Sequence, residues 1–294
     1  MAKNTKEYPE RMGMSIPLTT KGKIPELISK YKIKSLLDVG CADGRFTEVL
    51  AASLPKNVTI DAIDTCSDGG GDDSHIKKTG RVNYYITDFA NVPYVIGKTY
   101  DCIVFSSVMH EISSYCEDDG EKYSQKPIFN TLKTAYGLLN PGGVVVVRDM
   151  VKPSWKTRSV PVEMLPFDNA VTFLKFITEC PYLKPEYDKC FETKFFAYDT
   201  GDRILFNVRN DVLMEFLMTA TWGPESMDRE IMEKKFILKK GDWKKAFQKA
   251  GLAMEHYEET NEEYPMYFDR LVRIWEPMWK YPATTCLMVG VKAR

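Results

Sequence analysis

Short apolar runs alternate with amphipathic stretches over the first half of this chain, which is the pattern of parallel strands separated by helices. Five such runs lie at 34–39, 58–64, 82–87, 100–107 and 144–147. The last run is β-branched throughout, which predicts a strand that is buried on both faces. Apolar residues with helical spacing at 46–52 and 127–139 predict helices between the strands. The pattern therefore predicts an α/β fold with a doubly wound parallel sheet.

The second half of the chain has a less regular pattern, because prolines between 153 and 185 break it into short segments. The elements expected there are two amphipathic helices, one capped helix and two strands, at 168–179, 211–221, 242–251, 254–259 and 284–291. Asp242 is the expected N-cap of the third of these helices, and Gly251 ends it. The return of strands near the C-terminus indicates that the chain comes back to the first sheet.

These patterns divide the chain into four parts. Residues 1–22 form an irregular N-terminal arm, which is followed by a helix that starts at Pro25. Residues 23–150 form the core, and 151–240 form a helical cap that is inserted after the fifth strand. Residues 241–294 supply the C-terminal part of the core sheet.

Composition limits the partners and the compartment. The net charge of −1 over 294 residues gives no general attraction to nucleic acid or to an anionic membrane. The only basic cluster is the run of lysines at 234–249, which Glu233 precedes and Asp242 interrupts, so we expect a solvated helix face there. The seven cysteines form no C-x-x-C pair, and no apolar run approaches membrane-spanning length. We therefore expect a cytoplasmic protein without a membrane partner.

A glycine-containing turn, residues 40–44, follows the first strand and leads into a helix. Glycines at such a turn let the backbone approach a ligand closely. Both dinucleotide enzymes and S-adenosylmethionine (SAM) enzymes place their cofactor at such a loop. The dinucleotide fingerprint G-x-G-x-x-G lacks its second glycine here, and an acid, Asp38, stands two residues before Gly40.

With these residues the chain resembles the class I SAM-dependent methyltransferases, whose first motif is acid-x-G-x-G-x-G. Ala42 departs from the motif, because the family usually has glycine there. A second match is the stretch 138–143, Leu-Leu-Asn-Pro-Gly-Gly, which is similar to the L-x-P-G-G turn before the fifth strand of that family. The resemblance covers about residues 33–143 with good motifs. It implies a Rossmann-like sheet of seven strands, the seventh antiparallel, and a cap that shapes the acceptor pocket.

The resemblance also implies a cofactor site. An acid after the second strand, Asp64, is expected to bind the ribose hydroxyls, and Asp88 and Phe89 are expected to meet the adenine. The alternatives are a solvated Asp64, a helix-capping Asp88 and a core Phe89. The full set of expected cofactor residues is Asp38, Gly40, Cys41, Ala42, Gly44, Asp64, Thr65, Asp88, Phe89 and Ser106. The resemblance implies that the cofactor is SAM, which would give S-adenosylhomocysteine (SAH) as its product.

The fourth strand leads directly into His110 and Glu111, at the edge of a parallel sheet where ligands bind. Asp149 ends the fifth strand at the same edge. We expect His110 to act as a general base that Glu111 or Asp149 orients, or only to position the acceptor. The H-E-x-x-H zinc motif lacks its second histidine because residue 114 is serine, and we expect no metal site.

The resulting expectation is methyl transfer from SAM to an oxygen or nitrogen atom of a small molecule. RNA or an unusual DNA nucleotide is the alternative acceptor, because the D/N-P-P-Y and Pro-Cys motifs of common DNA methyltransferases are absent. Two other classes stay open, a SAM-binding protein without catalysis and, less favoured, a nicotinamide oxidoreductase. Nothing in the sequence indicates an oligomeric state.

Overall fold

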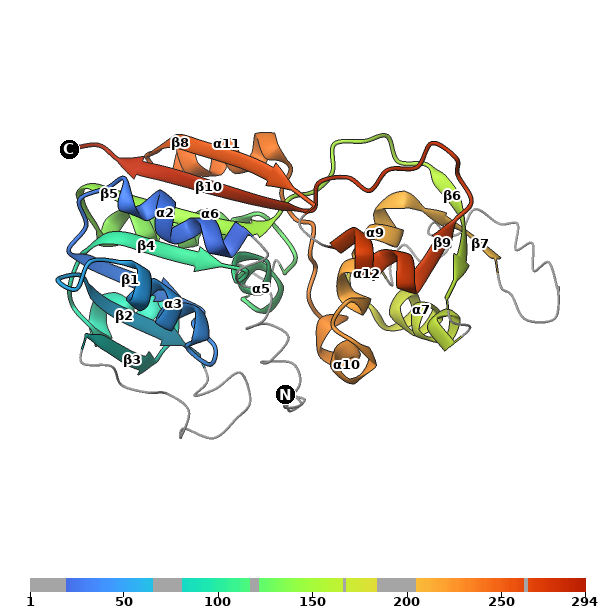
Figure 1. The fold of residues 1–294 in the computed structure, drawn as a ribbon, viewed down its shortest axis with the longest axis horizontal. Helices are drawn as coiled ribbons and strands as arrows, with labels where there is room; N and C mark the ends of the chain where they lie inside the picture. Colours follow the sequence, from blue (N-terminus) through green and yellow to red (C-terminus); the bar gives the residue numbers. More distant parts are fainter. Residues whose placement is uncertain (1–19, 66–80, 117–121, 166–167, 184–204, 262–263) are drawn as a thin grey trace.

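The structure, a computed structural model, describes residues 20–65, 81–116, 122–165, 168–183, 205–261 and 264–294. Figure 1 shows two bodies side by side, the core with its large sheet and the cap with a small one. The strands of the core are β1 (Ser35–Val39), β2 (Thr59–Asp64), β3 (Val82–Ile86), β4 (Tyr100–Ser106), β5 (Leu139–Met150), β8 (Leu252–Thr260) and β10 (Thr285–Lys292). Its helices include α2 (Ile24–Ser29), α3 (Arg45–Ser53), α4 (Val92–Val95), α5 (Met109–Tyr115), α6 (Lys126–Leu138) and α11 (Lys240–Lys249).

The core sheet has seven strands in the order β3-β2-β1-β4-β5-β10-β8. The first five of these are parallel, and β10 runs antiparallel to both β5 and β8. The fifth strand starts earlier than predicted, because Leu139 already pairs with Tyr100 before a bulge that brings Val144 opposite Cys102. The predicted Rossmann-like methyltransferase fold, with its antiparallel last strand, is confirmed.

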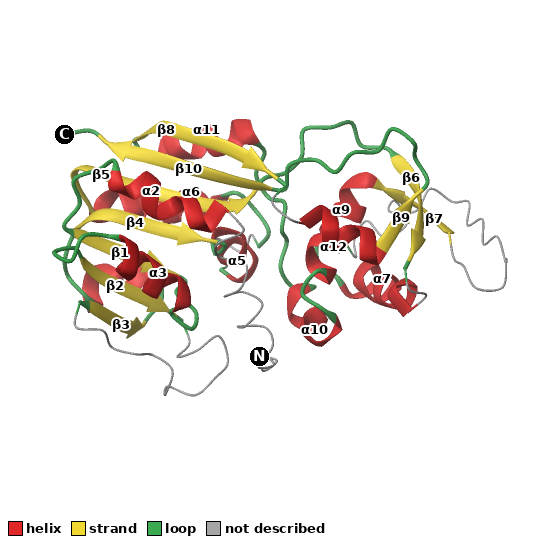
Figure 2. Ribbon diagram, viewed as in Figure 1, coloured by secondary structure: helices red, strands yellow, loops and turns green. Residues whose placement is uncertain are grey.

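Alternate residues of the strands are buried on opposite faces of this sheet. Leu36 packs with α2 and α3, whereas its neighbour Leu37 belongs to the cluster that contains residues of α6 and α11. Cys102 and Ile103 divide in the same way on β4. Figure 2 shows helices on both sides of the sheet. Burial on both faces explains why the central strands are almost purely apolar.

The cap differs from the helical insertion that the sequence predicts. Its helices are α7 (Asp168–Glu179), α9 (Asn210–Ala220), α10 (Met227–Glu230) and α12 (Tyr264–Leu271). It also contains a three-stranded sheet in the order β7 (Leu205–Arg209), β6 (Ser159–Met164) and β9 (Val272–Ile274). Phe268 and Val272, from a stretch that we assigned to the core sheet, pack in the cap cluster. The cap is therefore built from two separate stretches of the chain.

Two local expectations near the end of the cap are wrong. Asp242 does not cap α11, because Lys239 is the N-cap and Asp242 lies in the first turn of the helix. The run 234–249 is not one solvated face either. Lysines on α11 are exposed, but Glu233 and Lys235 are buried before the helix starts, at 2% and 1% exposure. The charge pattern alone did not distinguish the two situations.

One sequence expectation, the N-terminal arm, lies mostly outside the described residues. The predicted helix at Pro25 is present as α2, with the proline in its first turn. Among the described helices, none combines the length and the apolar character that a membrane crossing requires.

Candidate active site

The loop after β1 adopts a backbone that only glycine accommodates at its first position. Gly40 has φ +74°, and a Cβ atom placed on it would lie 2.7 Å from Val108 Cγ2. Its amide donates to the carbonyl of Ile63 on β2 at 2.9 Å, as the amide of Cys41 does at 3.1 Å. The turn is thereby fixed between the carboxyl ends of β1 and β2.

Asp64 at the end of β2 supports this loop from the side. Its Oδ2 accepts a hydrogen bond of 2.8 Å from the amide of Ala42, which itself has φ +48°. Gly44 at φ +79° precedes α3, and a Cβ atom there would lie 2.9 Å from the Tyr84 hydroxyl oxygen. Thr65, the next predicted contact, is exposed. Asp64 thus has a structural role in the loop beside the ribose role predicted for it.

Asp38 lies under the loop and is only 1% exposed. The Thr47 hydroxyl donates to its Oδ2 at 2.6 Å, which joins the end of β1 to the start of α3. Burial raises the pKa of Asp38 to about 6, although the bond from Thr47 and the charge of Lys21 act in the opposite direction. Asp38 and Thr47 therefore close the base of the glycine loop.

The two residues predicted at the adenine have the roles that we considered as alternatives. Asp88 is the N-cap of the short helix Phe89–Asn91, and its Oδ1 accepts from the amide of Ala90 at 2.8 Å. Phe89 is buried against Phe105, with ring centroids 5.1 Å apart. Neither role prevents a contact with adenine, so the binding roles stay predictions.

Ser106 is the residue of this edge that most directly suggests a ligand. It ends β4, is 8% exposed, and its hydroxyl has no hydrogen-bond partner among the described residues. The next residue, Ser107, has φ +61° and accepts a hydrogen bond from Arg148. A buried hydroxyl without a partner is unfavourable unless a ligand or water supplies one. The Ser106 hydroxyl and the backbone of the glycine loop 40–44 together fit a polar nucleoside cofactor.

His110 and Asp149 form a buried pair at the start of α5. Nδ1 of His110 lies 2.9 Å from Oδ1 of Asp149, and the amide of Met109 donates to Oδ2 of Asp149 at 2.7 Å. Asp149 on β5 therefore orients the imidazole and also caps the N-terminus of α5, where no capping side chain is available from Val108. The predicted proximity of these two residues is confirmed.

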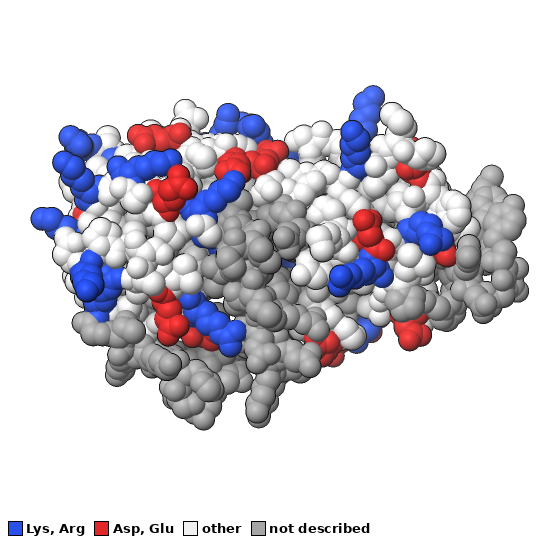
Figure 3. Space-filling view, in the orientation of Figure 1, with Lys and Arg blue, Asp and Glu red and all other residues white. Residues whose placement is uncertain are grey.

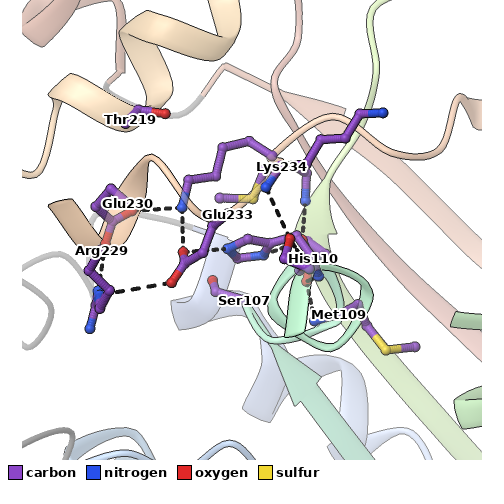
Figure 4. Close-up of polar contacts among 12 residues, drawn as sticks. Ser107, Met109, His110, Thr219, Arg229, Glu230, Glu233 and Lys234 are labelled. Carbon is purple, nitrogen blue, oxygen red and sulfur yellow. Dashed lines mark hydrogen bonds and ion pairs between the residues drawn. The ribbon is translucent and has the colours of Figure 1, made fainter. Parts of the chain in front are cut away.

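The cap supplies a third group, Glu233, which the sequence analysis did not identify. Its Oε2 lies 3.7 Å from Nε2 of His110 and 2.6 Å from Nζ of Lys235, and Tyr115 donates to its Oε1 at 3.0 Å. Lys235 also pairs with Glu230 at 2.6 Å. Figure 4 shows Glu233 pointing toward His110 from the cap side, with Arg229 and Glu230 behind it. A continuous chain of buried charges thus joins the core to the cap.

These contacts set the protonation of the cluster. Burial opposes the charge on His110, but Asp149 and Glu233 outweigh it and raise the pKa of His110 to about 10. Burial likewise opposes the charge on Glu233, yet Lys235 and His110 lower its pKa. Burial and the neighbouring Glu233 raise the pKa of Glu111. These effects favour the imidazolium form of His110 at neutral pH, in which both ring nitrogens carry a hydrogen.

His110, Glu111 and Glu233 each offer a ligand atom, and these atoms lie within 4.8 Å of one another. Such a set can hold a divalent metal in principle. However, the Lys235 ammonium, 2.6 Å from Glu233 Oε2, already provides a positive charge at this position. The arrangement is balanced as a network of ion pairs, and we assign no metal to it.

Comparison with known proteins places this arrangement in a family. A family model described as "Methyltransferase domain" matches residues 19–257, which is most of the chain. The chain belongs to this methyltransferase domain family. The search of curated protein sequences found no match. The sequence resemblance to a methyltransferase family is thereby confirmed.

Solved structures share the fold at low sequence identity. The plantazolicin methyltransferase BamL, solved with a triazolic desmethylPZN analog and SAH, is 13% identical with a TM-score of 0.54, and the match covers 98% of this chain and 89% of BamL. The related enzyme BpumL, solved with SAH, is 11% identical with a TM-score of 0.51 over 98% and 88% of the two chains. An O-methyltransferase family protein from Burkholderia thailandensis has a TM-score of 0.48 at 11% identity, and the match covers 97% of this chain but only 59% of that protein.

Proposed function

We propose that this protein transfers the methyl group of SAM to an oxygen or nitrogen atom of a small-molecule acceptor. The bound cofactor would supply a methyl group that its sulfonium already activates. The protein then has to bind the acceptor, orient it and exclude water. The observation that carries the proposal is the buried cluster of His110, Asp149 and Glu233, which joins the carboxyl edge of the core sheet to the cap.

The cofactor residues keep the roles that the sequence suggests. We propose that the backbone of 40–44 approaches the cofactor, that Asp64 and Thr65 bind the ribose, and that Asp88 and Phe89 meet the adenine. Ser106 is assigned to the same pocket because its buried hydroxyl needs a partner. Asp38 acts from beneath the loop, since it is almost fully buried.

His110 is proposed to hold the acceptor by donating a hydrogen bond from Nε2. Two buried acids keep its ring charged, so at neutral pH it has no lone pair with which to accept a proton. Glu111 is proposed as a second group that contacts the acceptor. Burial raises its pKa and so favours the protonated, neutral carboxyl. A base role for His110 requires that the acceptor first separates it from Glu233.

A small molecule is favoured over nucleic acid on grounds of charge. On the face that Figure 3 shows, Lys and Arg side chains lie among Asp and Glu side chains, and the net charge is −1. Nucleic-acid binding needs a basic surface that neutralises several phosphates. BamL, a methyltransferase of similar fold, has been solved in complex with a triazolic desmethylPZN analog and SAH. A cytoplasmic location is also proposed, since the described cysteines are free thiols.

The decisive experiment uses SAM with a labelled methyl group and a cell lysate that is separated into nucleic-acid, protein and small-molecule fractions. We expect label in the small-molecule fraction with the wild-type protein and much less with His110→Ala. Label in RNA or DNA would replace the proposal with the nucleic-acid alternative. Tight SAH binding without label in any fraction would favour a SAM-binding protein without catalysis. Preference for NADH over SAH in a competition titration would contradict both the proposed methyl transfer and the SAM-binding protein without catalysis.

A further inference from the structure

Three acids lie close to the His110 imidazole, and they differ in their hydrogen bonds. Asp149 accepts from His110 itself and from a backbone amide, and Glu233 accepts from the Lys235 ammonium at 2.6 Å. Glu111 receives no hydrogen bond from any described residue, and it is partly exposed, whereas the other two acids are buried. Of these three carboxyl groups, that of Glu111 is therefore the one left for a ligand.

His110 has an N–H group that the protein does not fully use. Its Nδ1 bonds to Asp149 at 2.9 Å, but its Nε2 lies 3.7 Å from Oε2 of Glu233, beyond the range of about 2.7–3.2 Å for N–H···O bonds. A ring nitrogen of His110 and a carboxylate oxygen of Glu111 lie within 4.8 Å of each other. Two atoms that each bond to the same third atom at about 2.9 Å can be up to about 5.8 Å apart. One acceptor atom can therefore bond to His110 and Glu111 together.

These two contacts decide which kind of atom can be methylated. The charged imidazole can only donate, so the acceptor atom must offer it a lone pair, and Glu111 must take a hydrogen from the same atom. A hydroxyl oxygen has one hydrogen and two lone pairs, so one lone pair remains to attack the methyl carbon. An amine nitrogen has a single lone pair, and a hydrogen bond from His110 would block it.

We propose that the methyl acceptor is a hydroxyl group, that Glu111 is the general base that removes its proton, and that His110 donates to the same oxygen. This inference rests on the proposed function and narrows the acceptor atom from oxygen or nitrogen to a hydroxyl oxygen. Burial and the charge of Glu233 raise the pKa of Glu111, which makes its carboxylate a stronger base than an exposed one.

The step balances with these groups and the methyl donor alone. The O–H bond of the acceptor breaks and its proton passes to a carboxylate oxygen of Glu111, while the acceptor oxygen forms a bond to the methyl carbon. The bond between that carbon and sulfur breaks, and its electron pair stays on the sulfur of SAH. The charge of His110 stabilises the negative charge that develops on the acceptor oxygen. Glu111, which is partly exposed, then releases the proton to water.

The first test identifies the methylated atom and needs no variant. SAM with a ¹³C-labelled methyl group is incubated with the wild-type protein and the small-molecule fraction of a lysate from cells grown on ¹⁵N-ammonium. NMR spectra of the products show whether the methyl carbon is coupled to ¹⁵N. We expect no such coupling, and we expect the ¹³C chemical shift of a methyl group on oxygen.

Other products would overturn the inference in distinct ways. Coupling to ¹⁵N would exclude the hydroxyl acceptor but leave the proposed methyl transfer to a small molecule in place. The chemical shift of a methyl group on sulfur or carbon would do the same. So would a product that mild alkali cleaves as a methyl ester, because its parent carboxylate has no proton to give. Label only in nucleic acid, or in no fraction, would instead contradict the proposed function itself.

The second test compares Glu111→Gln with Glu26→Gln, with the same small-molecule fraction as the acceptor. Glu26 also lies in the first turn of a core helix, α2, but it is exposed. We expect Glu111→Gln to slow methyl transfer by about 100- to 10,000-fold, the usual contribution of a general base, and to leave SAH binding in calorimetry unchanged. Glu26→Gln should change neither quantity.

The pH dependence separates a base from a residue that only shapes the site. The ionised form of Glu111 is the active one, so the wild-type rate should rise with pH as this carboxyl loses its proton, and the rate of Glu111→Gln should not. Both proteins keep the other groups that interact with Glu111, namely Glu233, His110, Lys235, Arg229 and Tyr115. Equal slopes, or a loss of SAH affinity that matches the loss of rate, would overturn the base role. If Glu111→Gln does not fold, a wild-type rate that stays flat with pH overturns it without the variant.

Discussion

Gly40 is a position where one added methyl group should have a large local effect. A side chain there would be strained at φ +74°, and its Cβ would overlap Val108 at 2.7 Å. We expect Gly40→Ala to lower the free energy of unfolding by at least about 2 kcal/mol, from overpacking and left-handed backbone strain together. SAH affinity should fall as well, because the loop amides shift. Urea unfolding and calorimetry would measure the two effects.

Gly137 is the matched control for this substitution. It lies in α6 with φ in the helical range, and a Cβ atom there meets nothing within 4 Å. Gly137→Ala should therefore stabilise the protein, by roughly 0.5–1 kcal/mol, because alanine has the higher helix propensity. Equal destabilisation by both alanine variants would contradict the assignment of Gly40 as a constrained loop residue.

His110 should make stability depend on pH in the alkaline range. Its pKa is about 10 in the folded protein against 6.5 ordinarily, so the folded state binds the proton more tightly. This contribution is complete below pH 6.5 and is lost as the pH rises toward 10. The wild-type protein should thus lose on the order of a few kcal/mol over that interval, at about 1.4 kcal/mol per pKa unit.

The measurement is urea unfolding at a series of pH values for the wild-type protein and His110→Gln. The variant should give a flatter profile between neutral pH and pH 10. Tyrosines and lysines that titrate near the upper limit affect both proteins, so the difference between the two profiles isolates His110. Identical slopes would show that His110 is not held in its charged form.

At the residue scale, the sequence predicted the groups that follow strands and missed the group that comes from the cap. His110 follows β4, and Asp149 lies at the end of β5. The carboxyl ends of parallel strands meet at one edge of the sheet, and this rule was sufficient to predict that the two residues lie close together. Glu233 is separated from His110 by more than a hundred residues and lies in a run of charges that is typical of a solvated surface. Its burial depends on how the cap packs against α5, which no local pattern contains.

At the scale of elements, α5 depends on a side chain from a neighbouring strand. Asp149 on β5 accepts from the amide of Met109 and pairs with His110, so one carboxylate caps the helix and neutralises its charged side chain. Asp149→Asn keeps an oxygen for the cap but removes the charge. We expect the pKa of His110 to fall well below 10 in this variant, because burial then dominates.

Proton NMR titration of the imidazole signals can measure this shift, since the chain contains only three histidines. Asp242→Asn is a suitable control, because Asp242 lies in the first turn of another helix, α11. It should leave the His110 titration unchanged. An unchanged titration in Asp149→Asn would mean that Glu233 alone holds the proton on His110.

The elements of the core were predictable and those of the cap were only partly so. Buried parallel strands such as β4 and β5 form apolar runs that leave little choice of structure. In the cap, β9 has only three residues. Strand β6 contains Pro161, although β6 is the central strand of its sheet. Proline usually breaks a strand because it lacks an amide hydrogen, but the carbonyl of Pro161 still accepts from Trp275 at 2.9 Å. The helices α7 and α9, with clear amphipathic spacing, were found.

At the scale of the whole molecule, the junction between core and cap contains charges rather than an apolar surface alone. Lys235, 1% exposed, lies between Glu230 and Glu233, and Glu233 in turn faces His110 on α5. Arg229 also pairs with Glu230, but among the described residues Lys235 is the one cation that bonds both acids at 2.6 Å. Loss of this ammonium removes a close partner from two buried carboxylates, which is more costly than loss of an exposed ion pair.

Lys235→Met should therefore loosen the junction without unfolding the sheet. We expect a destabilisation of about 3–5 kcal/mol, typical of a broken buried pair, and faster amide exchange in α5 and in 227–238. Strands β1 and β2, which contact neither acid, should keep their protection. Lys239→Met, at an exposed lysine four residues on, should change neither quantity. Hydrogen exchange with mass spectrometry can resolve these segments. Uniform acceleration through β1 and β2 would mean that core and cap unfold as one unit, and that the charged junction is not where the molecule first opens.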